Sequence, residues 1–253
     1  MKNIIEIKNL SFQYEKNTPV LDQLSLCIEE NTMNAILGAN GSGKSTLLDC
    51  LVGVNKGYSG EIVIDKRLLE TYTYRDFAKQ VAYISQSTVI NIDYSVRDFI
   101  LFGRTPYLNI GQSLSKEDYE KCETHAKKLG IEYLLNKSIT KISGGERQLC
   151  YICRALVQES KILIFDEPLS ALDFGNQNKL LRIFSELIRS GKTIIFTTHN
   201  PNQVLDLNCN VIVMNEKHIV SIGKASEVIT EDLLKKVYKD EVDVAKKHYT
   251  LKQ

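Results

Sequence analysis

One run in this chain of 253 residues has an immediate chemical meaning: Gly38–Ser45, which reads Gly-Ala-Asn-Gly-Ser-Gly-Lys-Ser. It fits the pattern G-x-x-x-x-G-K-[ST], in which a glycine-rich turn lets backbone N–H groups surround phosphate oxygens. Lys44 would supply a positive charge for the β and γ phosphates, and the Ser45 hydroxyl is a suitable ligand for Mg²⁺. A strand pattern at residues 33–37 precedes the run, and a helical pattern at residues 44–52 follows it. With both flanks correct, we predict a phosphate-binding loop and not a glycine turn that binds nothing.

Two neighbouring carboxylates form a second candidate site. The chain is continuously apolar between Lys161 and Asp166, as in a strand that is buried on both faces, and Glu167 follows directly. Ligands bind beyond the carboxyl ends of strands in open α/β sheets, so both carboxylates would face a ligand. We predict that Asp166 holds Mg²⁺ and that Glu167 polarises an attacking water. Without the phosphate loop, a merely solvated acidic pair would explain these residues equally well.

A second glycine-rich turn, Ser143-Gly144-Gly145, stands at the expected start of a helix. Free N–H groups at a helix N-terminus, a serine hydroxyl and two positions without side chains suit a terminal phosphate. Serine is also a common helix N-cap with no ligand at all. On the residues alone, the two interpretations are equally supported.

Taken together and in order, these motifs resemble the ATPase subunit of ABC transporters over nearly the whole chain. By this resemblance, residues 38–45 are the Walker A loop, residues 143–148 the signature motif and residues 170–173 the D-loop. Asp166 is then the Walker B aspartate, and Glu167 is the catalytic glutamate. The resemblance implies an ATPase that uses ATP and Mg²⁺.

Further single residues match the same family. Tyr14 resembles the aromatic residue that stacks on adenine, although a plain strand-end aromatic is the alternative. Gln86 matches the Q-loop glutamine, which reaches Mg²⁺ and the attacking water, and His199 matches the switch histidine of the γ-phosphate, with a surface histidine as the alternative. Ile142 and Glu146 depart from the family, which more often has leucine and glutamine there.

The resemblance thus assigns three sets of site residues. Those expected to bind nucleotide are Tyr14, Gly38, Ala39, Asn40, Gly41, Ser42, Gly43, Lys44, Ser45, Thr46, Ser143, Gly144, Gly145, Glu146 and Asp173. Those expected to be catalytic are Lys44, Gln86, Glu167 and His199. Those expected to hold Mg²⁺ are Ser45, Gln86 and Asp166.

Four local runs narrow the resemblance to one branch of the family. Residues 95–98, 103–107, 173–177 and 197–201 are similar to importers of iron-siderophores, haem, cobalamin and related metal chelates, a branch that includes some molybdate importers. The family resemblance implies a homodimer in which Lys44 of one copy and Ser143 of the other grip the same ATP. It also implies a membrane permease that docks near Gln86, a substrate-binding protein that acts indirectly, and a peripheral position on the cytoplasmic face of the membrane.

The expected fold class is α/β, a P-loop NTPase core with a mixed sheet, an antiparallel β layer and an inserted helical subdomain. We predict a single ABC ATPase domain over residues 1–253. Residues 1–86 and 161–253 would form the RecA-like core, and residues 87–160 the helical subdomain. The tail from Ala225 reads as helical.

Helix signals within the predicted subdomain are specific. Gly103 and Pro106 are expected to close one helix, and Ser115 with Asp118 reads as the capping box of the next. Apolar positions 119, 122, 126 and 129 would form its buried face. His125, His218 and His248 read as surface residues and receive no role.

Composition excludes several other classes. Lys+Arg is 32 and Asp+Glu is 31, so no strongly basic nucleic-acid surface is supported. Six cysteines, among them the pair Cys150 and Cys153, read as reduced thiols of a cytosolic protein. No apolar stretch is long enough to cross a membrane.

Motif spacing argues against two other classes of ABC protein. An ABC protein of DNA repair would carry long coiled coils between Ser45 and Asp166, and this sequence has no sustained heptads there. A ribosomal ABC protein would usually carry two cassettes in tandem, and one is present here. An exporter subunit remains a weaker alternative.

Overall fold

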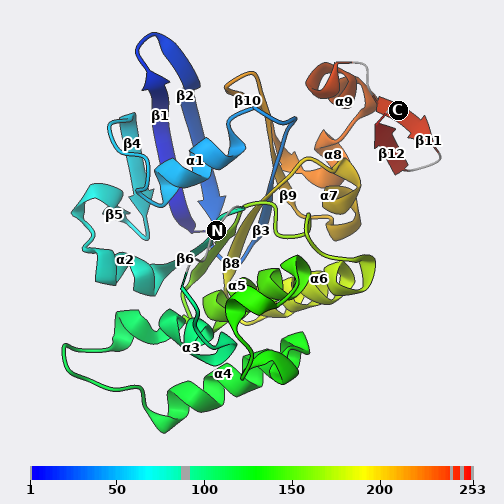
Figure 1. Cartoon of the computed structure of the whole chain (residues 1–253). Coiled ribbons are helices and arrows are strands. Elements are labelled where there is room, and N and C mark those ends of the chain that lie inside the picture. The colour runs from blue at the N-terminus through cyan, green and yellow to red at the C-terminus, as the bar shows by residue number, and fades with distance from the viewer. Residues whose placement is uncertain (1, 87–91, 240–241, 246–247, 252–253) are drawn as a thin grey trace. The chain divides into compact units, whose positions relative to one another are not determined.

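The computed structural model describes residues 2–86, 92–239, 242–245 and 248–251, and these form two compact units (Figure 1). The first unit contains residues up to Thr71 and from Thr193 onward, and the second contains Tyr72–Lys192. Residue 87, where we predicted the helical subdomain to begin, lies outside the described residues. Segments 72–86 and 161–192, which we assigned to the core, fall in the second unit, so the predicted core boundaries stay a prediction.

The first unit is built mainly from strands. Its strands are β1 (Asn3–Glu15), β2 (Thr18–Glu29), β3 (Met33–Leu37), β4 (Ser59–Ile64), β5 (Arg67–Leu68), β8 (Thr193–Thr198), β9 (Asn210–Asn215), β10 (His218–Lys224), β11 (Val242–Ala245) and β12 (His248–Leu251). Its helices are α1 (Lys44–Leu51), α7 (Pro201–Leu207), α8 (Ala225–Val228) and α9 (Glu231–Tyr238), with a 3₁₀ helix at Leu69–Thr71.

Two sheets organise this unit. Strands β2, β1, β4 and β5 form an antiparallel sheet in that order, in which Ile7 pairs with both Leu26 and Ile62. In the other, β3 lies between β8 and β9 and is parallel to both, while β10 pairs antiparallel with β9. All six residues of β8 are buried, which explains why three apolar residues, Ile194, Ile195 and Phe196, follow one another in it without alternation. The mixed sheet and the antiparallel layer were both predicted.

The second unit is mainly helical. Its helices are α2 (Tyr74–Gln80), α3 (Val96–Leu101), α4 (Lys116–Leu129), α5 (Gly144–Val157) and α6 (Phe174–Arg189), and its strands are β6 (Val81–Ile84) and β7 (Ile162–Phe165). Three 3₁₀ helices span Phe102–Tyr107, Glu132–Leu134 and Ile139–Lys141. Helices α3, α4 and α5 pack together, and β6 and β7 form a parallel pair (Figure 1). All four residues of β7 are buried.

Several predicted helix ends are confirmed. Ser115 and Asp118 form the predicted capping box, with both reciprocal hydrogen bonds present, and Gly130 ends α4 in the left-handed conformation. Cys150 and Cys153 are buried free thiols on α5. Helices α2 and α7 were not predicted, and α6 begins at Phe174 because Asp173 caps it.

Three expectations about the helices were wrong. Gly103 does not close a helix: it lies inside a 3₁₀ segment, where a Cβ would come 2.4 Å from the Arg154 carbonyl oxygen, so the glycine permits close packing on α5. Tyr119 is 40 % exposed, because the buried face of α4 carries Asp118 in its place. The tail is not wholly helical, since alternating residues such as Val242 and Val244 continue it as the β11–β12 hairpin.

A buried ion pair explains how an aspartate can occupy the inner face of α4. Arg104 donates from Nε to Asp118 Oδ1 at 2.7 Å and from Nη1 to the Val157 carbonyl at 3.0 Å and to Glu159 Oε2 at 2.8 Å. Burial alone would raise the pKa of Asp118, but hydrogen bonds from Ser115 and Arg104 outweigh it and lower that pKa. The arginine thereby ties the 3₁₀ segment to α4 and to the end of α5.

Replacing Ser115 with alanine removes the hydroxyl that caps α4. We expect the substitution to destabilise the protein by about 1 kcal/mol and to lower its melting temperature by about 2–4 °C. Ser113→Ala, an exposed serine just before the cap, is the matched control and should leave the melting temperature unchanged. Equal melting temperatures for the two variants would contradict the stabilising role of the cap.

Candidate active site

The predicted phosphate loop connects β3 to α1 within the first unit. Gly43 stands at the N-cap of α1 with φ +99°, and a Cβ there would lie 3.0 Å from the Val20 carbonyl oxygen. Only glycine meets both conditions without strain. Lys44 is 5 % exposed, and its ammonium donates to the carbonyl oxygens of Gly38 and Ala39 at 3.0 Å each. The loop therefore curls around the lysine side chain.

The loop has the chemistry of an anion site. The buried Ser42 hydroxyl has no hydrogen-bond partner among the described residues. No acidic residue occupies the first turn of α1, so nothing there competes with an anion for the positive end of the helix. Together with the Lys44 ammonium, these groups fit the phosphates of a nucleotide. Ser45 is exposed at the start of the same helix.

Tyr14 comes to this loop from the far end of β1. Its hydroxyl lies 3.4 Å from Thr46 Oγ1, in the first turn of α1, and accepts a hydrogen bond from Asn55 at 3.1 Å. Phe12 packs edge-on against it, with 4.9 Å between the ring centroids. The ring is 60 % exposed, so a flat surface remains available beside the phosphate loop. This placement suits a base-stacking residue, and that role stays a prediction.

His199 leaves the sheet at the same edge as the loop. Leu37 and Thr198 are partners in the parallel pairing of β3 and β8, so Gly38 and His199 both follow directly. The His199 carbonyl accepts a hydrogen bond of 2.8 Å from the hydroxyl of Tyr238, a buried residue on α9 whose pKa is raised by burial. Tyr238 therefore fixes the backbone of this corner. The sequence did not predict the contact between Tyr238 and His199, because no pattern within α9 indicates a contact with a strand end about forty positions earlier.

The carboxylates and the Q-loop glutamine meet in the second unit. The Asp166 amide donates to the Ile84 carbonyl at 2.8 Å, which extends the parallel pairing of β6 and β7 beyond the strands. Gln86 then donates from Nε2 to Glu167 Oε2 at 3.0 Å. Asp166 is 3 % exposed, and Glu167 is half-buried. The structure therefore brings together three of the four residues that we expected to handle metal and water; the fourth, Ser45, belongs to the first unit.

Glu167 also has an unusual backbone. Its φ is +47°, in the left-handed region that residues other than glycine rarely adopt. The Glu167 carbonyl accepts hydrogen bonds from the Ser170 amide at 3.2 Å and from the Ser170 hydroxyl at 2.9 Å. Such strain persists only where the surroundings hold it, and it is concentrated at functional sites. These bonds hold the backbone from which the Glu167 side chain reaches Gln86.

The signature motif forms the start of α5. The Ser143 hydroxyl accepts from the Glu146 amide at 3.3 Å, and the Glu146 carboxylate accepts from the Ser143 amide at 2.8 Å. These two bonds are a capping box, so both interpretations of this turn agree that Ser143 is the N-cap. Ser143 and Gly144 are exposed, and a Cβ on Gly144 would meet no atom within 4 Å. The turn therefore offers an open surface for a ligand.

The D-loop packs against the Ser143–Gly145 turn at the start of α5. A Cβ on Gly145 would lie 3.2 Å from the Ala171 carbonyl oxygen, so the two segments touch. Asp173 caps α6 by accepting from the Asn176 amide at 2.9 Å, and this bond lowers the pKa of its carboxyl group. Gln177, which sequence reasoning missed, donates to the carbonyls of Leu169 and Leu172 at 2.9 Å each. The carboxylate of Asp173 is thus structural in this chain, whatever its contact with nucleotide.

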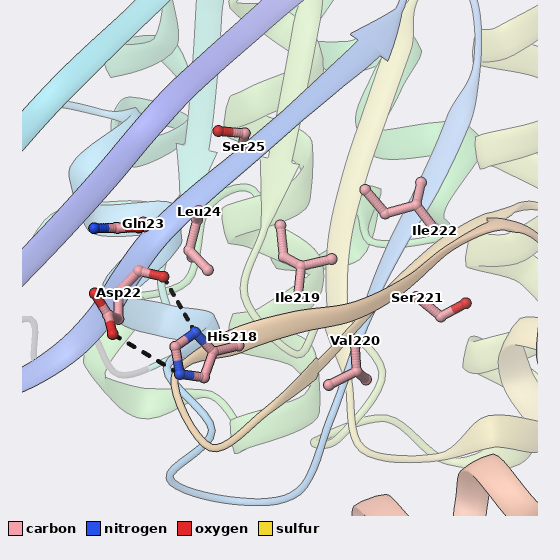
Figure 2. Close-up of a pocket in the computed structure, with 9 residues that line it drawn as sticks. All are labelled: Asp22, Gln23, Leu24, Ser25, His218, Ile219, Val220, Ser221 and Ile222. Atoms are coloured by element: carbon pink, nitrogen blue, oxygen red, sulfur yellow. Dashed lines mark hydrogen bonds and ion pairs between the residues drawn. The ribbon is translucent and has the colours of Figure 1, made fainter.

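The histidines without an assigned role are only partly as expected. His218 is 54 % exposed at the side chain and lines an open cavity of about 410 Å³ between β2 and β10, with Nδ1 3.3 Å from the Asp22 carbonyl oxygen (Figure 2). None of the predicted site residues lines this cavity. His125 is half-buried and not a surface residue: its Nδ1 has no hydrogen-bond partner among the described residues, and burial lowers its pKa.

Comparisons with known proteins match this geometry. The family model described as ABC transporter matches residues 21–170. An ABC transporter ATP-binding protein of Haemophilus influenzae is 33 % identical over 97 % of this chain and 93 % of its own length. The ferric enterobactin transport ATP-binding protein FepC of Escherichia coli is 32 % identical over 91 % of this chain and 85 % of its own. A solved metal-chelate type ABC transporter, in an inward-facing conformation, superposes with a TM-score of 0.82 at 29 % identity, covering 99 % of this chain and 98 % of that one.

The chain therefore belongs to the ABC transporter family, with the P-loop NTPase fold that the motifs predicted. It is a nucleotide-binding subunit whose ATPase activity is coupled to transport. ATP-binding subunits of importers dimerise and work with a membrane permease. Across the described part of this chain, no helix combines the length and the apolar character needed to span a membrane.

Gly43→Ala tests the geometry of the phosphate loop. A Cβ would strain the left-handed backbone and press on the Val20 carbonyl, so the loop N–H groups would no longer converge on phosphate. We expect the affinity for ATP, measured by calorimetric titration, to fall about tenfold or more. Gly53→Ala is the control: it has φ +71°, so it carries similar strain, but its Cβ would meet no atom within 4 Å and it lies outside the loop. Equal loss in both variants would contradict this explanation.

Proposed function

We propose that this chain is the ATP-hydrolysing subunit of an importer for iron chelates such as siderophores or haem, or for a cobalamin-like metal complex. The observation that carries the catalytic part is the hydrogen bond from Gln86 to Glu167, because it positions the carboxylate of the residue that directly follows Asp166. A carboxylate held in this way is suited to accept a proton from a water that attacks the γ-phosphate. Lys44 and His199, which follow the carboxyl ends of β3 and β8, would contact that phosphate.

The residues available for Mg²⁺ are oxygen donors. The Ser45 hydroxyl, the Gln86 amide oxygen and the Asp166 carboxylate are hard ligands of the type that Mg²⁺ prefers. Among the described residues, no group of three or more His, Cys, Asp or Glu side chains could hold a metal ion by itself. This suits Mg²⁺, which keeps several waters and binds through one or two protein groups together with phosphates. When bound, the ion would neutralise charge between the β and γ phosphates.

We further propose that two copies act as a head-to-tail pair. The exposed turn at Ser143 and Gly144 stands at the start of a helix of 14 residues, where free N–H groups favour an anion. In the proposed pair, this turn of one copy meets the ATP held by the Lys44 loop of the other. The donors then complete charge stabilisation only when the pair closes. A permease partner near Gln86 would hold the pair peripherally at the cytoplasmic face of the membrane, with a substrate-binding protein acting indirectly.

The names of relatives support the substrate class. FepC is named for ferric enterobactin, and the structural neighbour is of the metal-chelate type. A relative from Haemophilus influenzae that is 32 % identical over 92 % of this chain and 87 % of its own is named for molybdate import, so molybdate is the second candidate. Because this subunit does not contact the cargo, the permease decides between them.

Glu167→Gln tests the catalytic assignment. The amide keeps the size of the side chain and a partner for Gln86, but it cannot accept a proton from water. We expect ATP turnover to fall about a hundredfold or more, with the affinity for ATP changed less than about threefold. Phosphate release measures the first quantity, and calorimetric titration measures the second. Glu120→Gln, on the exposed face of α4, should leave both unchanged. Full hydrolysis by Glu167→Gln would rule out the proposed role.

Uptake by intact cells tests the cargo. Cells without this gene should lose accumulation of iron supplied as a siderophore or haem, and a plasmid copy of the gene should restore it. A copy with Glu167→Gln should not restore it, because the permease would lack its energy source. Molybdate uptake, measured in the same strains, distinguishes the second candidate: loss of molybdate uptake with intact iron uptake would contradict the iron-chelate proposal.

A further inference from the structure

Glu146 gives the signature motif a carboxylate where the family more often has a neutral glutamine. In the proposed head-to-tail pair, this motif meets the phosphates of a second copy. A free carboxylate three residues from Ser143 would repel those phosphates. The chain must therefore keep this negative charge away from the exposed side of the turn.

The structure shows what occupies the carboxylate. Glu146 Oε2 accepts from the Ser143 amide at 2.8 Å, and Glu146 Oε1 accepts from the hydroxyl of Tyr133 at 2.9 Å. Both oxygens are thus engaged by donors from the protein. Tyr133 lies on the 3₁₀ helix Glu132–Leu134, outside the signature motif, and its side chain is 60 % exposed.

A cation completes the arrangement. The ammonium of Lys137 lies 5.2 Å from the centroid of the Tyr133 ring, and its charge also lowers the pKa of Glu146. The largest contribution to that lowered pKa is the hydrogen bond from the Ser143 amide. The hydrogen bond from the Tyr133 hydroxyl to Glu146 raises the pKa of Tyr133, as expected for a phenol that donates to a carboxylate. These contacts stabilise the charged form of Glu146.

We propose that Tyr133 is a positioning residue of the signature motif. Its hydroxyl draws the Glu146 carboxylate against the start of α5, so that the exposed Ser143–Gly144 turn presents hydrogen-bond donors, and not negative charge, to the ATP of a second copy. This inference rests on the proposed pairing of two copies. It adds a residue outside the motif whose function depends on the acidic identity of position 146.

The test measures ATP-driven dimerisation of the full chain in the Glu167→Gln background, where hydrolysis does not deplete ATP. Light scattering during size-exclusion chromatography gives the ATP concentration at which half of the protein is dimeric. Tyr133→Phe keeps the ring and its contact with Lys137 but removes the hydroxyl. We expect it to raise that concentration about threefold to tenfold, the cost of losing one hydrogen bond to a charged group at a partly exposed site.

The decisive variant is the pair Tyr133→Phe with Glu146→Gln. Glutamine can still cap α5 by accepting from the Ser143 amide, and it carries no charge to be held back. Tyr133→Phe should therefore have almost no effect when Glu146→Gln is also present. An effect of equal size with and without Glu146→Gln would show a packing role and overturn the proposal. No effect of Tyr133→Phe in either background would overturn it as well.

Two controls separate this inference from the proposed function. Tyr119→Phe removes another partly exposed tyrosine hydroxyl from the same unit and should leave the dimerisation curve unchanged. ATP binding by the monomer, measured by calorimetric titration, should be the same in Tyr133→Phe and Tyr119→Phe as in their parent, since Tyr133 acts on the ATP of the other copy. If the Glu167→Gln parent itself does not dimerise with ATP, the proposed pairing is wrong, and the role of Tyr133 is overturned with it. Reduced binding by the Tyr133→Phe monomer would overturn only the role of Tyr133.

Discussion

The register of two parallel strand pairs is the constraint on which the site depends. Leu37 opposite Thr198 places the phosphate loop and His199 at one sheet edge, and Ile84 opposite Phe165 does the same for Gln86 and the two carboxylates. Parallel strands run in the same direction, so residues that follow paired positions leave the sheet at the same end. Segments 81 positions apart in the chain, such as Gln86 and Glu167, thereby come within hydrogen-bonding distance. A slip of one residue in either pair would separate these groups.

Burial of the strands maintains that register. Every residue of β7 and β8 is buried, so displacement of either strand would expose apolar surface or bury polar groups. The polar groups beyond the strand ends are positioned individually. Loop carbonyls accept hydrogen bonds from the buried ammonium of Lys44, and the backbone of Asp166 continues the ladder through its amide. A buried charge such as that of Lys44 persists only with such partners.

The sequence predicted the parts of the site that are encoded locally. The loop at Gly38–Ser45, the strand before Asp166 and the cap at Ser143 each depend on a few adjacent residues, and spacing alone identified them. The residues that hold these parts come from distant segments. Tyr238 supports His199, Gln177 supports the D-loop, and Tyr133 reaches Glu146, and no local pattern connects any of these pairs. Asp118 was predicted as a helix cap but not as a buried residue, because its partner Arg104 lies in another element.

The capping box of α5 restricts how its serine can meet a ligand. A hydroxyl group has one proton to donate and two lone pairs that accept. The Ser143 oxygen already accepts from the amide of Glu146, a bond that the start of the helix requires. Its proton contacts the Glu146 carboxylate, so it would turn from that carboxylate toward an incoming acceptor oxygen. Ser143 can therefore donate a hydrogen bond to an acceptor such as a phosphate oxygen. A ligand that offers only donors would compete with the Glu146 amide for the Ser143 oxygen, and binding it would break the N-terminal cap of α5.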